Sequence, residues 1–259
     1  DDDFDAVADQ TVSVSTTDDD VAGFTVAETD GSTGVDESGT TDIITVVLNA
    51  QPVSDVVMAI SSSDASETAV NGSTANNNSL TFTSENWDTP QSFTVTGVDD
   101  DLVDGTVNSI LTISVVDALS DNGFDAVADQ TVTASTTDDD VAGFTIVELD
   151  GSTEVDESGD TDTFTVVLDA QPTSDVVITI TSSDTGEATV TSTLTFTPAN
   201  WDTPQVATIT GVDDDIIDGS QTSTITVSID DANSDDDFDA VADQTVSVST
   251  TDDDVAGFT

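Results

Sequence analysis

Short runs of alternating hydrophobic and polar residues fill most of the chain. The runs are rich in Val, Ile, Thr and Phe, and they are separated by Asp, Gly, Asn and Pro, which favour turns. A period of two residues is typical of half-buried strands, and no long stretch shows the 3.6-residue period of a helix. The pattern therefore predicts an all-β chain.

The same runs occur more than once along the chain. Residues 1–25 recur without change at 235–259, and a variant copy occupies 122–145. Three motifs between these copies, VDESG, NWDTPQ and GVDDD, also occur twice in the same order. Recurrence at a long spacing indicates tandem domains, and the identical ends lead us to expect a longer array. The predicted organisation is the last strand of a preceding repeat at 1–20, complete repeats at 21–140 and 141–254, and the start of a following repeat at 255–259.

Each complete repeat contains seven predicted strands. An antiparallel sandwich of seven strands is the size of an immunoglobulin-like domain, so we expect two such sandwiches arranged end to end. The predicted strands of the first repeat lie near 23–28, 42–49, 55–62, 79–83, 91–97, 107–116 and 129–137. Those of the second lie near 143–148, 162–169, 175–182, 193–197, 205–211, 221–229 and 243–251.

The charge of the chain excludes several classes of function. Asp and Glu number 55, Lys, Arg and His are absent, and the net charge is −55. Without a basic patch we expect no nucleic-acid binding, and no apolar run or lipidation motif predicts membrane insertion of this segment. Cys is absent as well, so nucleophilic triads, Schiff bases and zinc thiolates lack their groups. Such charge is also common in disordered chains, but the alternating apolar runs predict a folded one.

The acids gather at turns rather than along strands. If the seven strands alternate in direction, the turns after the first, third and fifth strands share one pole with the end of the seventh. In the first repeat this pole collects Glu37, Asp64, Asp104, residues 99–101 and residues 138–140. Carboxylates this dense repel one another, and only external cations can offset the repulsion. Oxygen ligands in such number suit Ca²⁺ better than Mg²⁺ or softer metals.

The motifs TVSVSTTDDDVAGF, GVDDDIIDG and VDESG together resemble the Calx-beta family and the related repeats of large bacterial surface adhesins. The resemblance covers both complete repeats and implies that the first turn, the turn after the fifth strand and the closing Asp triplet hold Ca²⁺. Here Asp104 or Asp218 precedes a Gly, where the family is often richer in Glu. The candidate calcium ligands are Asp18, Asp19, Asp20, Glu37, Asp99, Asp100, Asp101, Asp104, Asp138, Asp139, Asp140, Glu157, Asp213, Asp214, Asp215, Asp218, Asp252, Asp253 and Asp254.

A mechanical role is the leading hypothesis for this chain. Only Val-Ala-Gly separates each Asp triplet from the next repeat, and the turns at 117–129 and 230–243 are expected at the opposite pole, facing the preceding cluster. Ca²⁺ at each junction would then convert a flexible array of domains into a rigid extracellular stalk, adhesin extender or fibril. The expected partners are neighbouring repeats or subunits, the expected place is the cell surface, and the resemblance points to a bacterial source.

Two other functions stay open at this point. The loops of Trp87 and Trp201, or the Asn-rich loop at 71–79, could bind a glycan or another cell, although the two Trp are expected to close the core. Alternatively, the acids could only solvate a halophilic protein without specific metal sites. A paired-carboxylate glycosidase is the one enzyme class that the side chains permit. Such an enzyme needs a cleft with aromatic walls, which the repeats do not offer, so we expect no enzyme. Residues 1–20 could pair within the chain or act as a donor strand.

Overall fold

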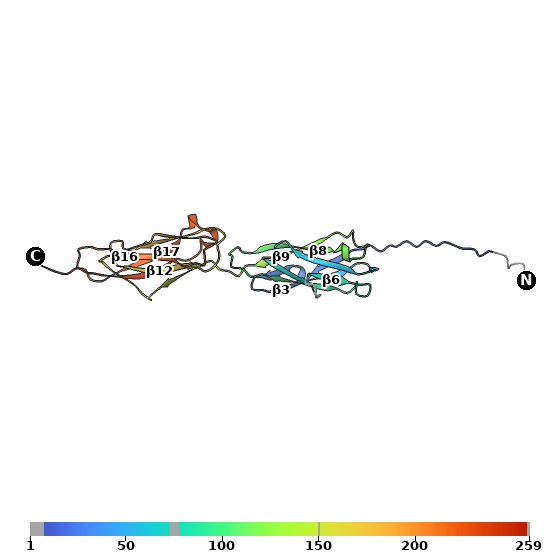
Figure 1. Ribbon diagram of the computed structural model, residues 1–259, viewed down its shortest axis with the longest axis horizontal. Helices are drawn as coiled ribbons and strands as arrows, with labels where there is room; N and C mark the ends of the chain where they lie inside the picture. Colours follow the sequence, from blue (N-terminus) through green and yellow to red (C-terminus); the bar gives the residue numbers. More distant parts are fainter. Residues whose placement is uncertain (1–7, 73–77, 150, 258–259) are drawn as a thin grey trace, which may run out of the picture.

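Two β-sandwiches follow one another along the long axis of the molecule in a computed structural model, which describes residues 8–72, 78–149 and 151–257 (Figure 1). Strands β1 to β9 form the first sandwich and β10 to β18 form the second. Within the described ranges the helical segments are 3-10 turns of three residues each. The all-β immunoglobulin-like fold predicted from the alternating pattern is thus confirmed.

Each sandwich packs a four-stranded sheet against a five-stranded sheet. In the first, the sheets have the orders β1-β3-β7-β5 and β2-β9-β8-β4-β6, and in the second β10-β12-β16-β14 and β11-β18-β17-β13-β15. The strands of the first sandwich are β1 (Phe24–Glu28), β2 (Thr33–Asp36), β3 (Thr41–Leu48), β4 (Val56–Ser62), β5 (Thr68–Gly72), β6 (Ser79–Phe82), β7 (Gln91–Gly97), β8 (Val107–Val115) and β9 (Gln130–Thr137). Those of the second are β10 (Phe144–Glu148), β11 (Thr153–Asp156), β12 (Thr161–Leu168), β13 (Val176–Ser182), β14 (Ala188–Val190), β15 (Thr193–Phe196), β16 (Gln205–Gly211), β17 (Gln221–Ile229) and β18 (Gln244–Thr251).

Two short strands in each repeat were missing from the seven predicted. All fourteen predicted strands are present, but β2 and β5, with their counterparts β11 and β14, raise the number to nine per sandwich. These strands have three to five residues and lie directly beside turn motifs, so the pattern assigned them to the turns. Tertiary pairing defines them instead, because β2 runs parallel to β9 and β5 pairs with β7. The prediction of seven strands was therefore incomplete.

A separate apolar core fills each sandwich. Alternate residues of every long strand point inward, and the largest fully buried side chains include Phe82 and Phe93 in the first core and Phe164 and Phe196 in the second. Trp87 and Trp201 are half-buried and pack against the edges of these cores, as the sequence suggested. The two Trp residues therefore form part of the apolar packing of each sandwich.

An extended tail precedes the first sandwich. Residues 8–20 are exposed and form no strand, whereas the identical residues 242–254 include β18 of the second sandwich. The interpretation of residues 1–20 as the last strand of a preceding repeat stays a prediction, and residues 1–7 lie outside the described part. The Asn-rich loop proposed for glycan binding also falls largely outside it, at 73–77. In the described residues, no helix combines the length and hydrophobicity needed to cross a membrane.

The junction between the sandwiches is short and hydrogen-bonded. Leu102, in the loop after β7, forms a parallel bridge with Gln171 of the second sandwich. The Gln171 amide donates to the Asp101 carbonyl at 2.6 Å, and the Val103 amide donates to the Gln171 carbonyl at 3.0 Å. Val103 also packs against the second core, together with Ala142 of the linker. The acidic loop of one sandwich is therefore also its contact with the next.

Candidate metal centre

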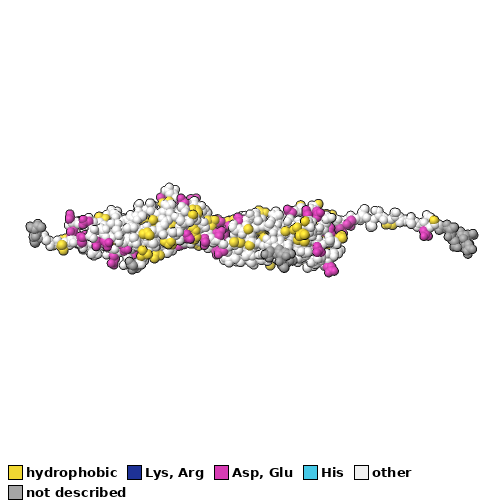
Figure 2. All heavy atoms as spheres, in the orientation of Figure 1, with side chains coloured by type: hydrophobic (Ala, Val, Ile, Leu, Met, Phe, Trp, Pro, Cys, Tyr) yellow, Lys and Arg dark blue, Asp and Glu magenta, His cyan; other side chains and the backbone are white. Residues whose placement is uncertain are grey.

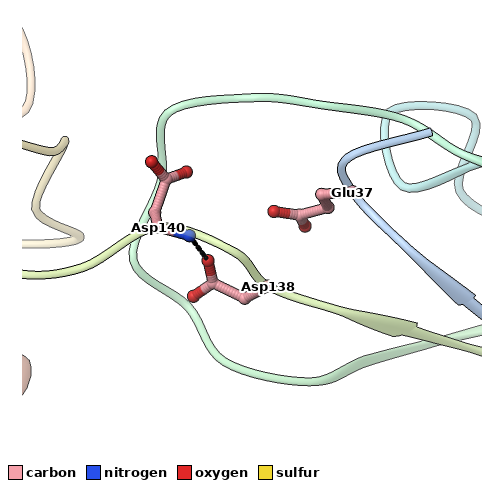
Figure 3. Close-up of side chains that lie close together, drawn as sticks. All are labelled: Glu37, Asp138 and Asp140. Atoms are coloured by element: carbon pink, nitrogen blue, oxygen red, sulfur yellow. Dashed lines mark hydrogen bonds between the residues drawn. The ribbon is translucent and has the colours of Figure 1, made fainter. Parts of the chain in front are cut away.

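Three carboxylates from two strand ends meet at the pole of the first sandwich that faces the second. Glu37 follows β2, and Asp138 and Asp140 follow β9; one carboxylate oxygen of each lies within 4.8 Å of the other two. Figure 3 shows the three side chains around one space, with the Asp140 amide bonded to Asp138. All of these residues belong to the predicted set.

Strand pairing explains why these residues meet. Because β2 and β9 are parallel and Asp36 pairs with Thr137, the next residue of each strand emerges at the same point. The Glu37 amide donates to the Thr137 carbonyl at 3.0 Å, which anchors the turn. The Asp36 carboxylate then accepts the Ser38 amide at 3.0 Å, and hydrogen bonds from Ser38 lower the pKa of Asp36.

Asp138 holds the surrounding loops with both carboxylate oxygens. Its Oδ2 accepts the amides of Asp104 and Gly105 at 3.1 and 2.8 Å, and its Oδ1 accepts the Asp140 amide at 2.7 Å. The loop after β7 is thereby tied to the end of β9. Asp138 thus connects the junction loop to the carboxylate cluster.

Several carboxylate oxygens at this pole are buried without a partner. Glu37 is 1% exposed and Glu67 is 5% exposed, and among the described residues nothing donates a hydrogen bond to Oε2 of either. The same holds for Oδ1 of Asp104 and Oδ2 of Asp140. Burial and then the charges of Asp138, Asp100, Glu67 and Asp104 raise the pKa of Glu37 to about 7. An unpaired buried acceptor lowers the stability of the fold, so binding a proton or a cation at these oxygens would stabilise it.

The pole of the second sandwich repeats this arrangement. Carboxylate oxygens of Glu157, Asp214 and Asp254 lie within 4.8 Å of one another, and Glu157 is 1% exposed. Asp252 accepts the amides of Gly219 and Asp254, both at 2.8 Å, as Asp138 does in the first sandwich. Oε2 of Glu157 and Oδ2 of Asp254 are buried and lack a donor within the described part of the chain. The two clusters therefore share the buried Glu and the last Asp of the triplet, while the third member is Asp138 in the first and Asp214, the counterpart of Asp100, in the second.

Glu67 and Glu187 also lie at these poles, although neither is among the candidate ligands; the turn after the third strand predicts the position of Glu187 at the pole but not that of Glu67. Each precedes a short strand and is buried at the pole, and each has an Oε2 with no donor among the residues described. Burial and then neighbouring Asp residues raise the pKa of both carboxyls. The repeated spacing Asp-x-x-Glu, at Asp64 and at Asp184, is the signal that could have identified them.

The other predicted ligands lie around these centres at different depths. Asp100 is half-buried, and its charge raises the pKa of Glu37, Glu67 and Asp104, each after the effect of burial. The tail triplet has no sandwich before it in this chain, and there the Asp20 amide donates to Asp18 at 3.1 Å, as in the other two triplets. The exposed members of the predicted set are Asp18, Asp19, Asp20, Asp99, Asp101, Asp139, Asp213, Asp215, Asp218 and Asp253.

The donor set of both poles suits a hard divalent cation. It consists of carboxylates alone, it is partly buried, and no side chain of the protein can supply a positive charge. Ca²⁺ takes six to eight such oxygens in a flexible shell, and loops of this kind can provide several of them. Figure 2 shows acidic side chains gathered at the junction and at the C-terminal end of the molecule.

The raised pKa of Glu37 predicts how stability depends on pH without metal. The folded-state pKa of about 7 lies above the ordinary 4.5, so the folded state binds more protons than the unfolded state between these values. Stability in EGTA should therefore fall as the pH rises toward about 7 and level off above it. Thermal unfolding between about pH 5 and 8 measures this, and Glu37→Gln should reduce the slope between about pH 5 and 7. An unchanged slope in Glu37→Gln would contradict the assignment.

The chain has only distant similarity to known proteins. No protein-family model matches the chain. A search of curated proteins also found no match. Among solved structures, calcium binding domain CBD12 of CALX1.1 is 16% identical, covering 78% of this chain and 79% of that one, with a TM-score of 0.30. Domains 4 and 5 of the S-layer protein SbsC are 17% identical, covering 61% and 69%, with a TM-score of 0.33. The apo-form Calx CBD1 domain is 16% identical, covering 47% and 100%, with a TM-score of 0.32. Likenesses this weak carry no functional conclusion.

Proposed function

We propose that this chain is a structural, non-catalytic segment of an extracellular rod in which Ca²⁺ at the acidic poles stiffens the junctions between sandwiches. The observation that carries the proposal is the pair of buried carboxylates, Glu37 and Glu157, which lie at equivalent poles with an oxygen that lacks a donor among the described residues. Each faces two Asp carboxylates within 4.8 Å. A cation would offset the charge that no residue of the chain can neutralise.

The ion at the junction would be held by carboxylates of Glu37, Glu67, Asp138 and Asp140. The loop after β7 would supply two further carboxylates, those of Asp100 and Asp104. The same loop bridges to Gln171 and places Val103 against the second core. An ion bound at the pole would therefore hold the loop against the ends of β2 and β9. The loop would in turn hold the second sandwich in line with the first.

An extracellular setting fits this chemistry. Extracellular calcium modules bind with dissociation constants of about 0.1–1 mM, so their sites are filled outside cells. The chain also has no Lys or Arg, so trypsin-like proteases find no cleavage site in it. Neighbouring sandwiches are the proposed partners.

Small-angle scattering with and without a chelator tests the proposal. We expect the elongated shape of Figure 1 in calcium and a broader distribution of interdomain angles in EGTA, because the pole carboxylates then repel one another. Glu37→Gln should lose this calcium dependence. Glu157→Gln is the matched control, since it changes the same group at the pole that faces no sandwich in this chain, and it should keep the response.

The outcome separates the metal hypothesis from halophilic acidity. If the acids serve only solvation, shape and stability should follow the KCl concentration and ignore calcium at constant ionic strength. Identical scattering in calcium and EGTA would therefore overturn the proposed function.

A further inference from the structure

Two adjacent apolar side chains are exposed at the C-terminal pole of the second sandwich. Ile216 and Ile217 lie in the loop after β16 and are 60% and 57% exposed. They stand in a loop that is otherwise acidic, where water would favour polar residues. An exposed pair of large apolar residues at such a place suggests a contact surface.

The junction inside the chain shows what the equivalent residues do. The motif GVDDD is followed by Leu102 and Val103 in the first sandwich and by Ile216 and Ile217 in the second. Leu102 and Val103 are half-buried, because they bridge to Gln171 and pack against the next core. Ile216 and Ile217 thus hold the positions that form the inner junction in the first sandwich, but they are exposed.

The matching half lies at the opposite end of the molecule. Gln51 occupies in the first sandwich the place of Gln171 in the second, within the shared sequence Ala-Gln-Pro. The two side chains are anchored alike: Nε2 of Gln51 donates to the Ser84 carbonyl at 2.8 Å, and Nε2 of Gln171 donates to the Pro198 carbonyl at 3.0 Å. Gln51 is exposed where Gln171 is half-buried. The backbone that receives the loop is therefore already held in place at the N-terminal end.

The hollows beside the two glutamines also correspond. At the junction, Asp140, Ala142 and Asp237 line a hollow next to Val103. At the N-terminal end, Asp20, Ala22 and Gly123 occupy the equivalent positions in a hollow next to Gln51. The segment beside both hollows is the same, because Asp-Asp-Asp-Val-Ala-Gly occurs at 18–23 and at 138–143, and it occurs again after the second sandwich at 252–257.

We propose that Ile216 and Ile217 dock on the first sandwich of a second copy of this chain, with Ile216 bridging to Gln51 of that copy. The proposal deepens the proposed function, because it names the partner of the free pole. It is separable from the calcium site, since the contact is made by main-chain hydrogen bonds and apolar side chains rather than by carboxylates.

This contact carries less like charge than the junction inside the chain. Asp237 of the second sandwich faces Asp104 across the inner junction and contributes to the raised pKa of Asp104, after burial and the charges of Asp100 and Asp138. Gly123 replaces Asp237 in the proposed contact. Docking through Ile216 and Ile217 should therefore survive calcium removal better than the inner junction.

Disulfide trapping tests the contact in a fusion of two copies of the chain. Residue 259 of the first copy is joined to residue 26 of the second, so the segment shared by 1–25 and 235–259 occurs once between them. The protein has no Cys, so Ile216→Cys and Gln51→Cys in the second copy introduce the only pair. Leu102→Cys with Gln171→Cys is the positive control, since these residues are bridge partners. Ile216→Cys with Asp30→Cys in the second copy is the negative control, because Asp30 follows β1 at the other pole of its sandwich.

We expect the Ile216–Gln51 pair to lose its free thiols under mild oxidation as completely as the Leu102–Gln171 pair, and the negative control to keep them. Disulfide formation by the Ile216–Gln51 pair, either in both calcium and EGTA or in calcium alone, supports docking. Failure to trap in calcium, while Leu102–Gln171 closes, overturns the docking proposal. That failure would leave the scattering response to calcium as it is, so the two proposals fall separately.

Discussion

In calcium at about 100 times its dissociation constant, the protein should unfold about 10 °C higher than in EGTA, because one occupied site adds about 2.7 kcal/mol to the stability of its sandwich. The effect is large because the metal-free pole keeps buried carboxylate oxygens without donors in the described part of the protein. Calcium would convert that unfavourable arrangement into a set of ligands. Differential scanning calorimetry in the two conditions measures the shift.

Glutamine variants provide the controls for this shift. The double variant Glu37→Gln and Glu157→Gln removes one buried carboxylate from each pole and should lose most of the shift. Glu85→Gln makes the same chemical change at an exposed residue between β6 and β7, and it should keep the shift. Equal unfolding temperatures of the unchanged protein in calcium and EGTA would refute the calcium assignment.

Replacing Gly97 by alanine should destabilise the first sandwich by about 3 kcal/mol, as expected for overpacking against a fixed backbone. A Cβ at this position would lie 2.0 Å from the carbonyl oxygen of Asp36 and 2.6 Å from its carbonyl carbon. Strand β2 would have to move away from β7, and Glu37 would move with it. Urea denaturation measures the loss, and calcium titration should show weaker binding at this pole.

Gly34→Ala is the matched control for this substitution. Gly34 lies in the same short strand, and a Cβ there meets no atom within 4 Å. Its stability and calcium affinity should therefore stay close to those of the unchanged protein. Gly211→Ala should reproduce the damage in the second sandwich, because its Cβ would lie 2.0 Å from the Asp156 carbonyl oxygen. If Gly97→Ala were as stable as Gly34→Ala, the close packing of β2 on β7 would be wrong.

Much of the fold follows from the sequence because the long strands are strongly patterned. Strands β3 and β8 have eight and nine residues, and every second residue is buried over five positions of each, which is enough to identify the strand and its buried face. The same pattern occurs in both repeats, so each predicted strand of one repeat is supported by its counterpart in the other. The short strands β2 and β14 have no such length, and pairing with distant neighbours defines them.

Part of the candidate centre could be predicted in the same way. Counting strand ends from the pattern assigned Glu37 and the triplet at 138–140 to one pole, and the structure brings Glu37, Asp138 and Asp140 together. Glu67 was missed because a single Glu after a turn has an ordinary explanation as a solvated charge. The Asp-x-x-Glu spacing that it shares with Glu187 marks its position, but its burial depends on tertiary contacts of β5 and of the loop after β7.

Periodicity, repetition and charge are properties of the order of residues, so the amino-acid sequence is enough to identify a tandem β chain with acidic turns and no basic residue. The folded chain alone reveals which carboxylate oxygens are buried without a donor among the described residues, and which loop joins one sandwich to the next. Those properties depend on the parallel register of β2 with β9 and on the bridge from Leu102 to Gln171. Both are contacts between residues far apart in the chain, where local pattern carries no information about distance.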